Sequence, residues 1–203
     1  MATARDPGEL GADQVVAAAT VLARAFQDDA GTVFFLPDAA ERAAILPAFF
    51  APMVRFAVTH GETATLGDPL AAVAFWLPPE VAATPAGLEE AGMGAVVASW
   101  SPTVQARFGA FVGHLGAEHA RLMGEIPHWT LFFVGVVPGS QGAGLGSRLL
   151  RPMRERLQQD GAVCYTETLE ARNLPFYERL GFRVIAESDV PGSRTHVWSL
   201  RVG

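Results

Sequence analysis

A glycine-spaced loop, between an apolar run and a helical pattern, is the feature that most constrains this chain. The apolar run ends at Pro138, and glycine then occupies positions 142, 144 and 146. This order predicts a strand, a tight turn and the start of a helix. The first N–H groups of a helix lack intrahelical partners and lie at its positive end, and glycines let a ligand approach the backbone. Residues 142–147 are therefore predicted to hold a phosphate-bearing ligand.

Two common nucleotide-binding loops do not match this stretch. A dinucleotide fingerprint needs G-x-G-x-x-G in a βαβ unit, whereas these glycines are spaced two apart. A P-loop needs Gly-Lys-Ser/Thr, but the chain contains no lysine and all 15 of its basic residues are arginine. The sequence therefore indicates a phosphate-binding loop of another kind.

The loop resembles the Q/R-x-x-G-x-G/A pyrophosphate loop of the GCN5-related N-acetyltransferases, the GNAT superfamily. Their second hallmark has a counterpart in residues 173–182, NLPFYERLGF, with room for one helix and one strand in between. The resemblance implies a single-domain α/β GNAT fold over residues 1–203: a mixed, mostly antiparallel central sheet flanked by helices, with splayed central strands. It implies an acceptor-side half at about 1–127 and an acetyl-CoA-binding half at about 128–203.

The resemblance also implies an enzyme that moves an acetyl group directly from acetyl-CoA, its acyl-donor substrate, to an amine, without a metal. Backbone groups at 134–136 are expected to hold the pantetheine arm, and an N–H near Val134 to stabilise the oxyanion. The expected cofactor-binding residues are Val134, Gly135, Val136, Gln141, Gly142, Ala143, Gly144, Leu145, Gly146, Ser147 and Asn173.

Tyr177 matches the superfamily tyrosine that protonates the leaving thiolate. Asn173 lies four residues before it, whereas the superfamily asparagine often lies seven before it. Four residues are about one helical turn, so both side chains still share a face. The general base stays open between Glu167, on the strand beside the cofactor, His128, whose ordinary pKa suits proton removal near neutrality, and a chain of waters.

The acceptor is expected to be a small-molecule amine, such as an antibiotic or a metabolite. Roughly the last 75 residues resemble the puromycin N-acetyltransferases and their actinobacterial relatives, and predicted helices within 80–126 favour a covered site. Acetylation of protein N-termini or lysines, and a catalytically silent acyl-CoA-binding regulator, remain the alternatives. The aromatic candidates for the pocket wall, each also suited to the core, are Phe34, Phe35, Trp76, Trp100 and Trp129.

Charge and cysteine usage narrow the class of protein. The net charge is −6, which argues against a nucleic-acid partner. The apolar stretch 43–58 contains two prolines and an arginine, so a kinked core helix is expected there and not a membrane span. The single cysteine, Cys164, excludes an internal disulfide, favours a cytoplasmic location and suits a buried position better than a nucleophilic one. Monomer and homodimer both stay open.

The hydrophobic periodicity predicts an alternation of helices and strands after a flexible tail of about a dozen residues. The expected helices cover 13–28, 43–58, 85–100, 103–123, 145–160 and 173–180. The expected strands cover 62–66 and 70–77, as a hairpin, then 129–137 and 162–168, and finally 183–187 and 196–202 as an antiparallel pair. His119 falls on the apolar stripe of the helix at 103–123, where a packed core or cleft position is expected.

Overall fold

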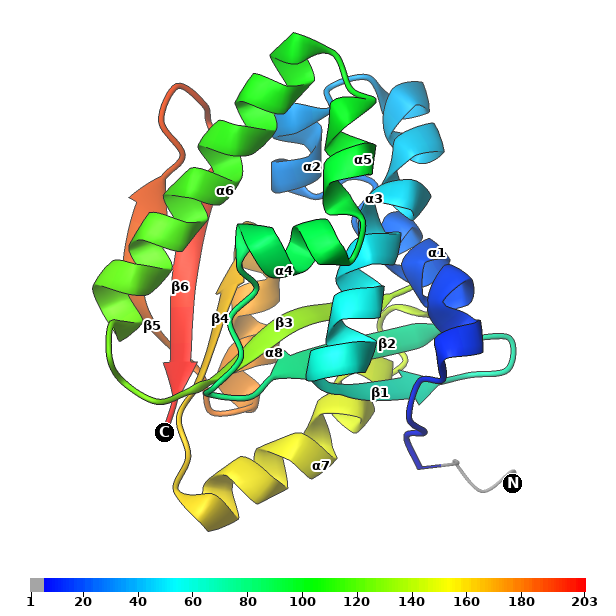
Figure 1. Ribbon diagram of the computed structural model, residues 1–203. Helices are drawn as coiled ribbons and strands as arrows, with labels where there is room; N and C mark the ends of the chain where they lie inside the picture. The colour runs from blue at the N-terminus through cyan, green and yellow to red at the C-terminus, as the bar shows by residue number, and fades with distance from the viewer. Residues whose placement is uncertain (1–5) are drawn as a thin grey trace.

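The computed structural model describes residues 6–203 as one twisted sheet with helices on both faces (Figure 1). The strands are β1 (Glu62–Leu66), β2 (Ala72–Leu77), β3 (Trp129–Val136), β4 (Cys164–Thr168), β5 (Arg183–Asp189) and β6 (His196–Val202). The α-helices are α1 (Val15–Ala25), α2 (Ala30–Phe35), α3 (Ala39–His60), α4 (Pro85–Glu90), α5 (Met93–Ala98), α6 (Pro102–Met123), α7 (Leu145–Asp160) and α8 (Leu174–Arg179).

The strands lie in the order β1-β2-β3-β4-β6-β5. Every neighbouring pair is antiparallel except β3 and β4, which run parallel. The expected hairpin of β1 with β2 and the expected pairing of β5 with β6 are both confirmed. The fold class is therefore the expected one, a mixed and mostly antiparallel sheet flanked by helices.

Strand β2 separates two hydrophobic cores because successive side chains of a strand point to opposite faces. Val73 and Phe75 belong to the core formed with α1 and α3. Ala74 and Trp76 belong to the second core, which α7 and α8 cover from the other face. All six residues of β2 are buried, so this strand anchors the sheet between its two helical layers.

Helix α3 runs through Pro47 and Pro52 as one helix of 22 residues, longer at both ends than the expected 43–58. By length and composition it is long and apolar enough to cross a membrane. Its side chains Leu46, Phe50 and Val54 are nevertheless fully buried in the core against α1 and the sheet. The expectation of a core helix is thus confirmed.

Two local expectations are wrong, and one helix was not expected. Within the described part of the expected tail, Gly8 pairs with Thr65 of β1 through two backbone hydrogen bonds and Leu10 is buried, whereas residues 1–5 lie outside the described residues. The helix expected over 85–100 is two short helices, because Gly92 between them adopts a positive φ of 99°. Helix α2 was not expected, and Asp29 caps it by accepting a hydrogen bond from the N–H of Gly31.

Candidate active site

Strands β3 and β4 separate soon after they begin. They pair only at Trp129 with Cys164 and at Thr130 with Tyr165, whereas β3 pairs with β2 as far as Val136. The register of β2 against β3 also shifts between Phe75 and Trp76, which marks a bulge opposite the separating strands. One edge of β3 beyond Thr130 therefore lacks a strand partner.

A cavity of about 1230 Å³ opens at this separation. Its walls combine β3, β4, α2, α3, α6, α8 and the glycine loop, and parts of the chain more than a hundred residues apart meet around it. Among the residues that line it are Val134, Gly135 and Val136, together with Glu167 and Tyr177. The strand separation thus brings most of the expected donor-side and proton-transfer positions to one cavity.

The glycine loop borders one end of this cavity. Gly142 and Gly144 have φ values of 79° and 76°, and a Cβ at either position would meet no atom within 4 Å. Gly144 is the N-cap of α7 and, as a glycine, offers no side chain to cap the N–H groups of the first turn. An open, left-handed glycine loop before a 16-residue helix suits a phosphate ligand.

Two contacts hold this loop in place. The Gln141 side chain donates to the Val136 carbonyl at 3.1 Å, which ties the loop to the end of β3. A Cβ on Gly146 would lie 3.2 Å from the Phe176 ring, so glycine allows α7 and α8 to approach closely. Gln141, Gly142, Gly144, Leu145, Gly146 and Ser147 all line the cavity, and Ala143 does not.

The Glu167 side chain is held by Tyr165 of the same strand, and Tyr165 in turn contacts Ser199 of β6. The Tyr165 hydroxyl donates to Glu167 Oε1 at 2.7 Å and lies 3.1 Å from the Ser199 hydroxyl. Burial raises the pKa of Glu167 from 4.5 to about 7; the negative charge of Glu118 adds to the rise, and the hydrogen bond from Tyr165 opposes it. A carboxylate with a pKa near neutrality can both take up and release a proton.

Both ring nitrogens of His128 are occupied. Nδ1 lies 2.6 Å from the Ile126 carbonyl oxygen and Nε2 lies 2.7 Å from Nε2 of His119. A carbonyl oxygen only accepts, so Nδ1 carries a proton, and a neutral His128 must then accept from His119. The His119 ring stacks on Tyr165 with centroids 4.6 Å apart, and burial, helped by His128, lowers its pKa to about 4. His119 therefore lies at the cavity, as expected for a packed cleft residue.

Tyr177 and Asn173 both line the cavity from the α8 region. Tyr177 is buried between Phe176 and Phe182, whose ring centroids lie 5.1 Å and 5.8 Å from its own. Burial raises the pKa of Tyr177 above its ordinary value, so its phenol stays protonated at neutral pH. The Asn173 amide donates to the Thr168 hydroxyl at 3.1 Å, and so holds the end of β4 to the start of α8.

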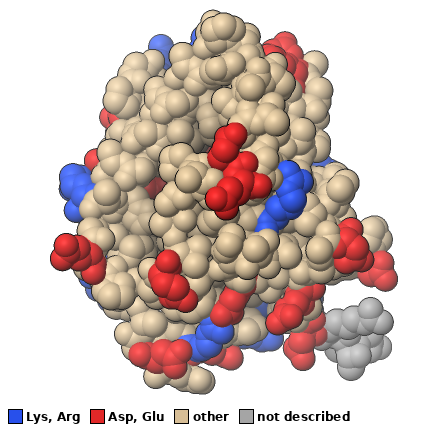
Figure 2. Space-filling view, in the orientation of Figure 1, with Lys and Arg blue, Asp and Glu red and all other residues tan. Residues whose placement is uncertain are grey.

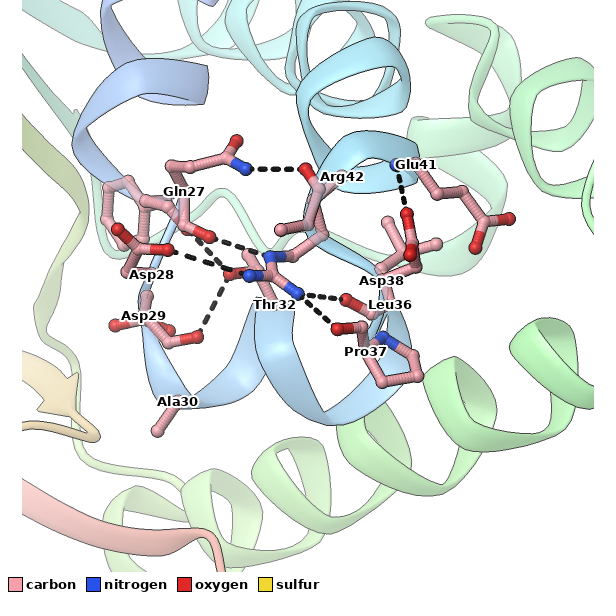
Figure 3. A network of polar contacts seen from close by, with 12 residues as sticks. Gln27, Asp28, Asp29, Ala30, Thr32, Leu36, Pro37, Asp38, Glu41 and Arg42 are labelled. Atoms are coloured by element: carbon pink, nitrogen blue, oxygen red, sulfur yellow. Dashed lines mark hydrogen bonds and ion pairs between the residues drawn. The ribbon is translucent and has the colours of Figure 1, made fainter.

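A buried arginine fixes the turn that leads into α2 (Figure 3). Arg42, only 5% exposed, donates to the carbonyl oxygens of Gln27, Leu36 and Pro37 at 2.7–2.8 Å. The Thr32 hydroxyl donates to the Phe26 carbonyl at 2.5 Å. These contacts hold Asp29 in the cavity wall, where burial raises its pKa to about 6.

The sequence interpretation missed several residues of the site and overestimated others. Tyr165 has a detectable signal, since it lies two residues before Glu167 on one strand and therefore on the same face. Ser199 and Asp29 have no such signal in the sequence. Ser199 reaches Tyr165 only because β4 and β6 pair, and Asp29 reaches the cavity wall only because it caps α2. Among the five aromatic pocket candidates, Phe35 lines the cavity, whereas Trp76 and Trp100 are buried in the cores and Phe34 and Trp129 lie outside the lining.

Cys164 is fully buried, and burial raises the pKa of its thiol to about 12, so it has no nucleophilic character. Within residues 6–203, no group of three or more His, Cys, Asp or Glu side chains is arranged to hold a metal ion.

Sequence comparison identifies a family and a curated protein that the chain resembles. Residues 103–184 match the family described as an acetyltransferase (GNAT) domain. Over 54 residues the chain is 37% identical to an uncharacterized N-acetyltransferase of Schizosaccharomyces pombe. That segment covers 27% of this chain and 22% of the yeast protein, so the similarity spans about a fifth of that relative's length.

Solved structures resemble the chain over nearly its whole length. A histone acetyltransferase HPA2-related protein from Corynebacterium glutamicum has a TM-score of 0.68 at 20% identity, covering 98% of this chain and 96% of that one. An agmatine N-acetyltransferase has a TM-score of 0.59 at 15% identity, covering 98% and 99%. A polyamine N-acetyltransferase of Drosophila melanogaster has a TM-score of 0.57 at 15% identity, covering 97% and 98%. At these identities the likeness is one of fold.

Proposed function

We propose that this chain belongs to the GNAT superfamily of N-acetyltransferases and moves an acetyl group from acetyl-CoA directly to the amine of a small molecule. One observation carries the proposal: the glycine loop, the unpaired edge of β3, Glu167 and Tyr177 all border a single cavity. Transfer from a phosphorylated thioester to an amine needs a site that binds the phosphates and a strand edge whose backbone groups bind the thioester arm. It also needs a base that deprotonates the amine and an acid that protonates the leaving thiolate.

The donor side is formed by the glycine loop and β3. The start of α7, which has no side-chain cap, and the open space at Gly142 and Gly144 suit the coenzyme A pyrophosphate. Backbone groups at 134–136, on the strand edge without a partner, suit the amides of the pantetheine arm. Acetyl-CoA supplies the acetyl group as an activated thioester.

Glu167 is the general base in this proposal, because its carboxylate titrates near neutrality and lies at the cavity. It accepts a proton from the ammonium of the acceptor, which leaves a nucleophilic amine. His128 suits this role less well, because Ile126 and His119 already occupy its two ring nitrogens. Tyr165 and Ser199 are positioning residues that orient the Glu167 carboxylate.

Tyr177 is the general acid in this proposal. Its phenol stays protonated at neutral pH because burial raises its pKa, and it can donate that proton to the leaving thiolate. The amine gives up its second proton as the amide forms, which restores the phenol. The overall reaction converts an ammonium and a thioester into an amide, a thiol and one released proton.

The acceptor class rests on two supports. Solved relatives include proteins described as agmatine and arylalkylamine N-acetyltransferases, which act on small amines. In this chain α6 and the segment before α4 line the cavity, which favours a covered site over an open peptide groove. Resistance to an aminonucleoside antibiotic stays a prediction from the resemblance of the last 75 residues to puromycin N-acetyltransferases.

The test is the release of free coenzyme A from acetyl-CoA with a panel of small amines, aminonucleosides and peptides with free N-termini. The proposal expects amine-dependent release that Tyr177→Phe lowers. Release with peptides alone would favour the protein-acetylating alternative. Tight acetyl-CoA binding without release for any acceptor would favour a silent regulator and would overturn the proposal.

A further inference from the structure

The acceptor end of the cavity is walled by aromatic rings from α2, α3, α6 and β3. Phe108, Phe111 and Phe133 line it and are half-buried, whereas the rings of Phe35, Phe49 and Phe50 pack against them from the core and are at most 5% exposed. Their rings pack against one another, with centroids 5.3 Å apart for Phe35 and Phe108, 5.0 Å for Phe49 and Phe50, and 5.5 Å for Phe50 and Phe133. These distances are typical of stable aromatic pairs, so the wall is formed before any ligand arrives.

Helix α6 presents an apolar stripe to this cavity and leaves much of it uncovered. Of its 22 residues only Val104 and Met123 are buried, although Phe111, Val112 and Leu115 all line the hollow. Val112 is 40% exposed. Each Å² of apolar surface removed from water contributes about 25 cal/mol, so a ligand that covers this stripe gains by being apolar.

Four carboxylates line the cavity, Asp29, Glu125, Glu167 and Glu170, and Glu125 among them is exposed to solvent. Two of these carboxylates are already engaged: Asp29 accepts from the Gly31 N–H at 2.9 Å, and Glu170 accepts from the Ala30 N–H and lies 3.4 Å from Arg172. Among residues 6–203, Glu167 accepts a side-chain hydrogen bond only from Tyr165, at Oε1. The face of the molecule in Figure 2, which carries α4, α5 and α6 in the orientation of Figure 1, is mostly uncharged and has no continuous acidic surface for a polycation.

From this combination, we infer that the acceptor is a primary amine with a single ammonium group and a bulky aromatic body. The ammonium lies toward Glu167 and the aromatic body covers the phenylalanine wall and the α6 stripe. The inference rests on the proposed function and narrows its substrate class. It disfavours polyamines, whose further ammonium groups would lose water at the apolar wall without a carboxylate to pair with.

The test compares 2-phenylethylamine, methylamine and spermidine as acceptors, and places a carboxylate in the α6 stripe. Leu115→Glu puts a charge where the apolar body should lie. Ala110→Glu puts the same charge on an exposed α6 residue outside the cavity lining, and serves as the matched control. Wild type should prefer 2-phenylethylamine over both other amines in kcat/KM.

Leu115→Glu should lower the kcat/KM ratio of 2-phenylethylamine to spermidine at least about tenfold and leave the KM for acetyl-CoA unchanged, because a buried charge repels apolar groups and attracts cations. Ala110→Glu should leave that ratio at the wild-type value. The ratio is independent of the fraction of folded enzyme, so partial unfolding does not imitate the effect. Equal or higher kcat/KM for spermidine or methylamine in wild type would overturn the inference while leaving the proposed function standing.

Calorimetric titration of 2-phenylethylamine tests the aromatic site without turnover. Binding that Leu115→Glu weakens and Ala110→Glu does not would support the site even if no acceptor releases coenzyme A, in which case the proposed function alone fails. Absence of 2-phenylethylamine binding to wild type saturated with coenzyme A would overturn the inference.

Discussion

Replacement of Glu167 by glutamine separates the chemistry of this carboxylate from its contribution to stability. The amide has nearly the same shape, and its oxygen can still accept the hydrogen bond that the Tyr165 hydroxyl donates at 2.7 Å. What is lost is a group that takes up a proton near neutrality. We expect kcat to fall on the order of 10²-fold, the usual contribution of a positioned base.

The pH dependence of kcat/KM should change in a defined way. Because burial raises the Glu167 pKa to about 7, wild-type kcat/KM should fall tenfold for each pH unit below about 7. The glutamine variant should lose this fall of kcat/KM below pH 7. Any pH dependence that comes from ionisation of the acceptor amine itself should stay. Measurement with one acceptor from about pH 5 to about pH 9 covers both regions.

Stability should change in the opposite direction to activity. A carboxyl whose pKa is 4.5 unfolded and about 7 folded binds more protons in the native state, so wild type loses stability as pH rises through this window. At about 1.4 kcal/mol per pKa unit, the charged native state is disfavoured by roughly 3 kcal/mol above pH 7. The variant should therefore be more stable than wild type near pH 8, and this difference should shrink near pH 5.

The assay combines steady-state kinetics with urea unfolding at both pH values, and Glu178→Gln, an exposed carboxylate on α8, is the control with unchanged behaviour. Wild-type kcat/KM that stays flat through pH 7, or a variant with full kcat, would refute Glu167 as the base. A variant that is less stable than wild type near pH 8 would refute the burial argument, since it would make the ionised carboxylate a stabilising group.

Three further substitutions test other parts of the account. Tyr177→Phe should lower kcat on the order of 10²-fold with little change in acetyl-CoA affinity, and full kcat with a saturating acceptor would make the tyrosine a packing residue. Gly144→Asp should weaken acetyl-CoA binding, measured by calorimetry, at least about tenfold. Gly144→Asn is the control and should weaken binding less, because asparagine tolerates the φ of 76° at this position and carries no charge. Equal affinities of the two variants would reject the glycine loop as the phosphate site. Arg42→Met should lower the free energy of unfolding by roughly 2–5 kcal/mol, because three buried carbonyls lose their donor, and a urea-derived loss below about 1 kcal/mol would contradict this.

The sheet and the glycine loop could be predicted closely because their signals are local. Strands β1 and β6 have the expected bounds, and α7 begins and ends at its glycines as expected. Alternating or continuous apolar runs, turn residues and helix caps each act within a few positions. The positive φ values of Gly142 and Gly144 agree with the same reasoning.

The parts that could not be predicted depend on contacts between distant segments. Gly8 pairs with Thr65 of β1, which is 57 residues away in the sequence, and α2 is too short to show a period. Pro47 and Pro52 do not break α3, because tertiary packing of its apolar side chains overrides local helix preference. The short helices α4 and α5 were merged in the expectation because a single glycine inside a helical pattern is often tolerated.

In the candidate site, too, features that depend on local sequence could be predicted and features that depend on contacts between distant segments could not. The positions on the loop, on β3 and on α8 follow from motifs, and nearly all of them border the cavity. The occupied ring nitrogens of His128 and the bond from Tyr165 to Glu167 arise from side-chain geometry that spacing does not encode. The phenylalanine wall joins four separate elements, so the acceptor end could be described only from the fold.

The most direct test of the central claim follows the acetyl group itself. The protein is incubated with acetyl-CoA labelled in its acetyl group, with and without 2-phenylethylamine, and the label is located by mass spectrometry. Direct transfer predicts label on the amine nitrogen, free coenzyme A in equal amount, and no label on the protein at any time, since Cys164 is buried and its thiol is protonated. Label that accumulates on the protein before it reaches the amine, or that stays on coenzyme A with every amine offered, would contradict the account.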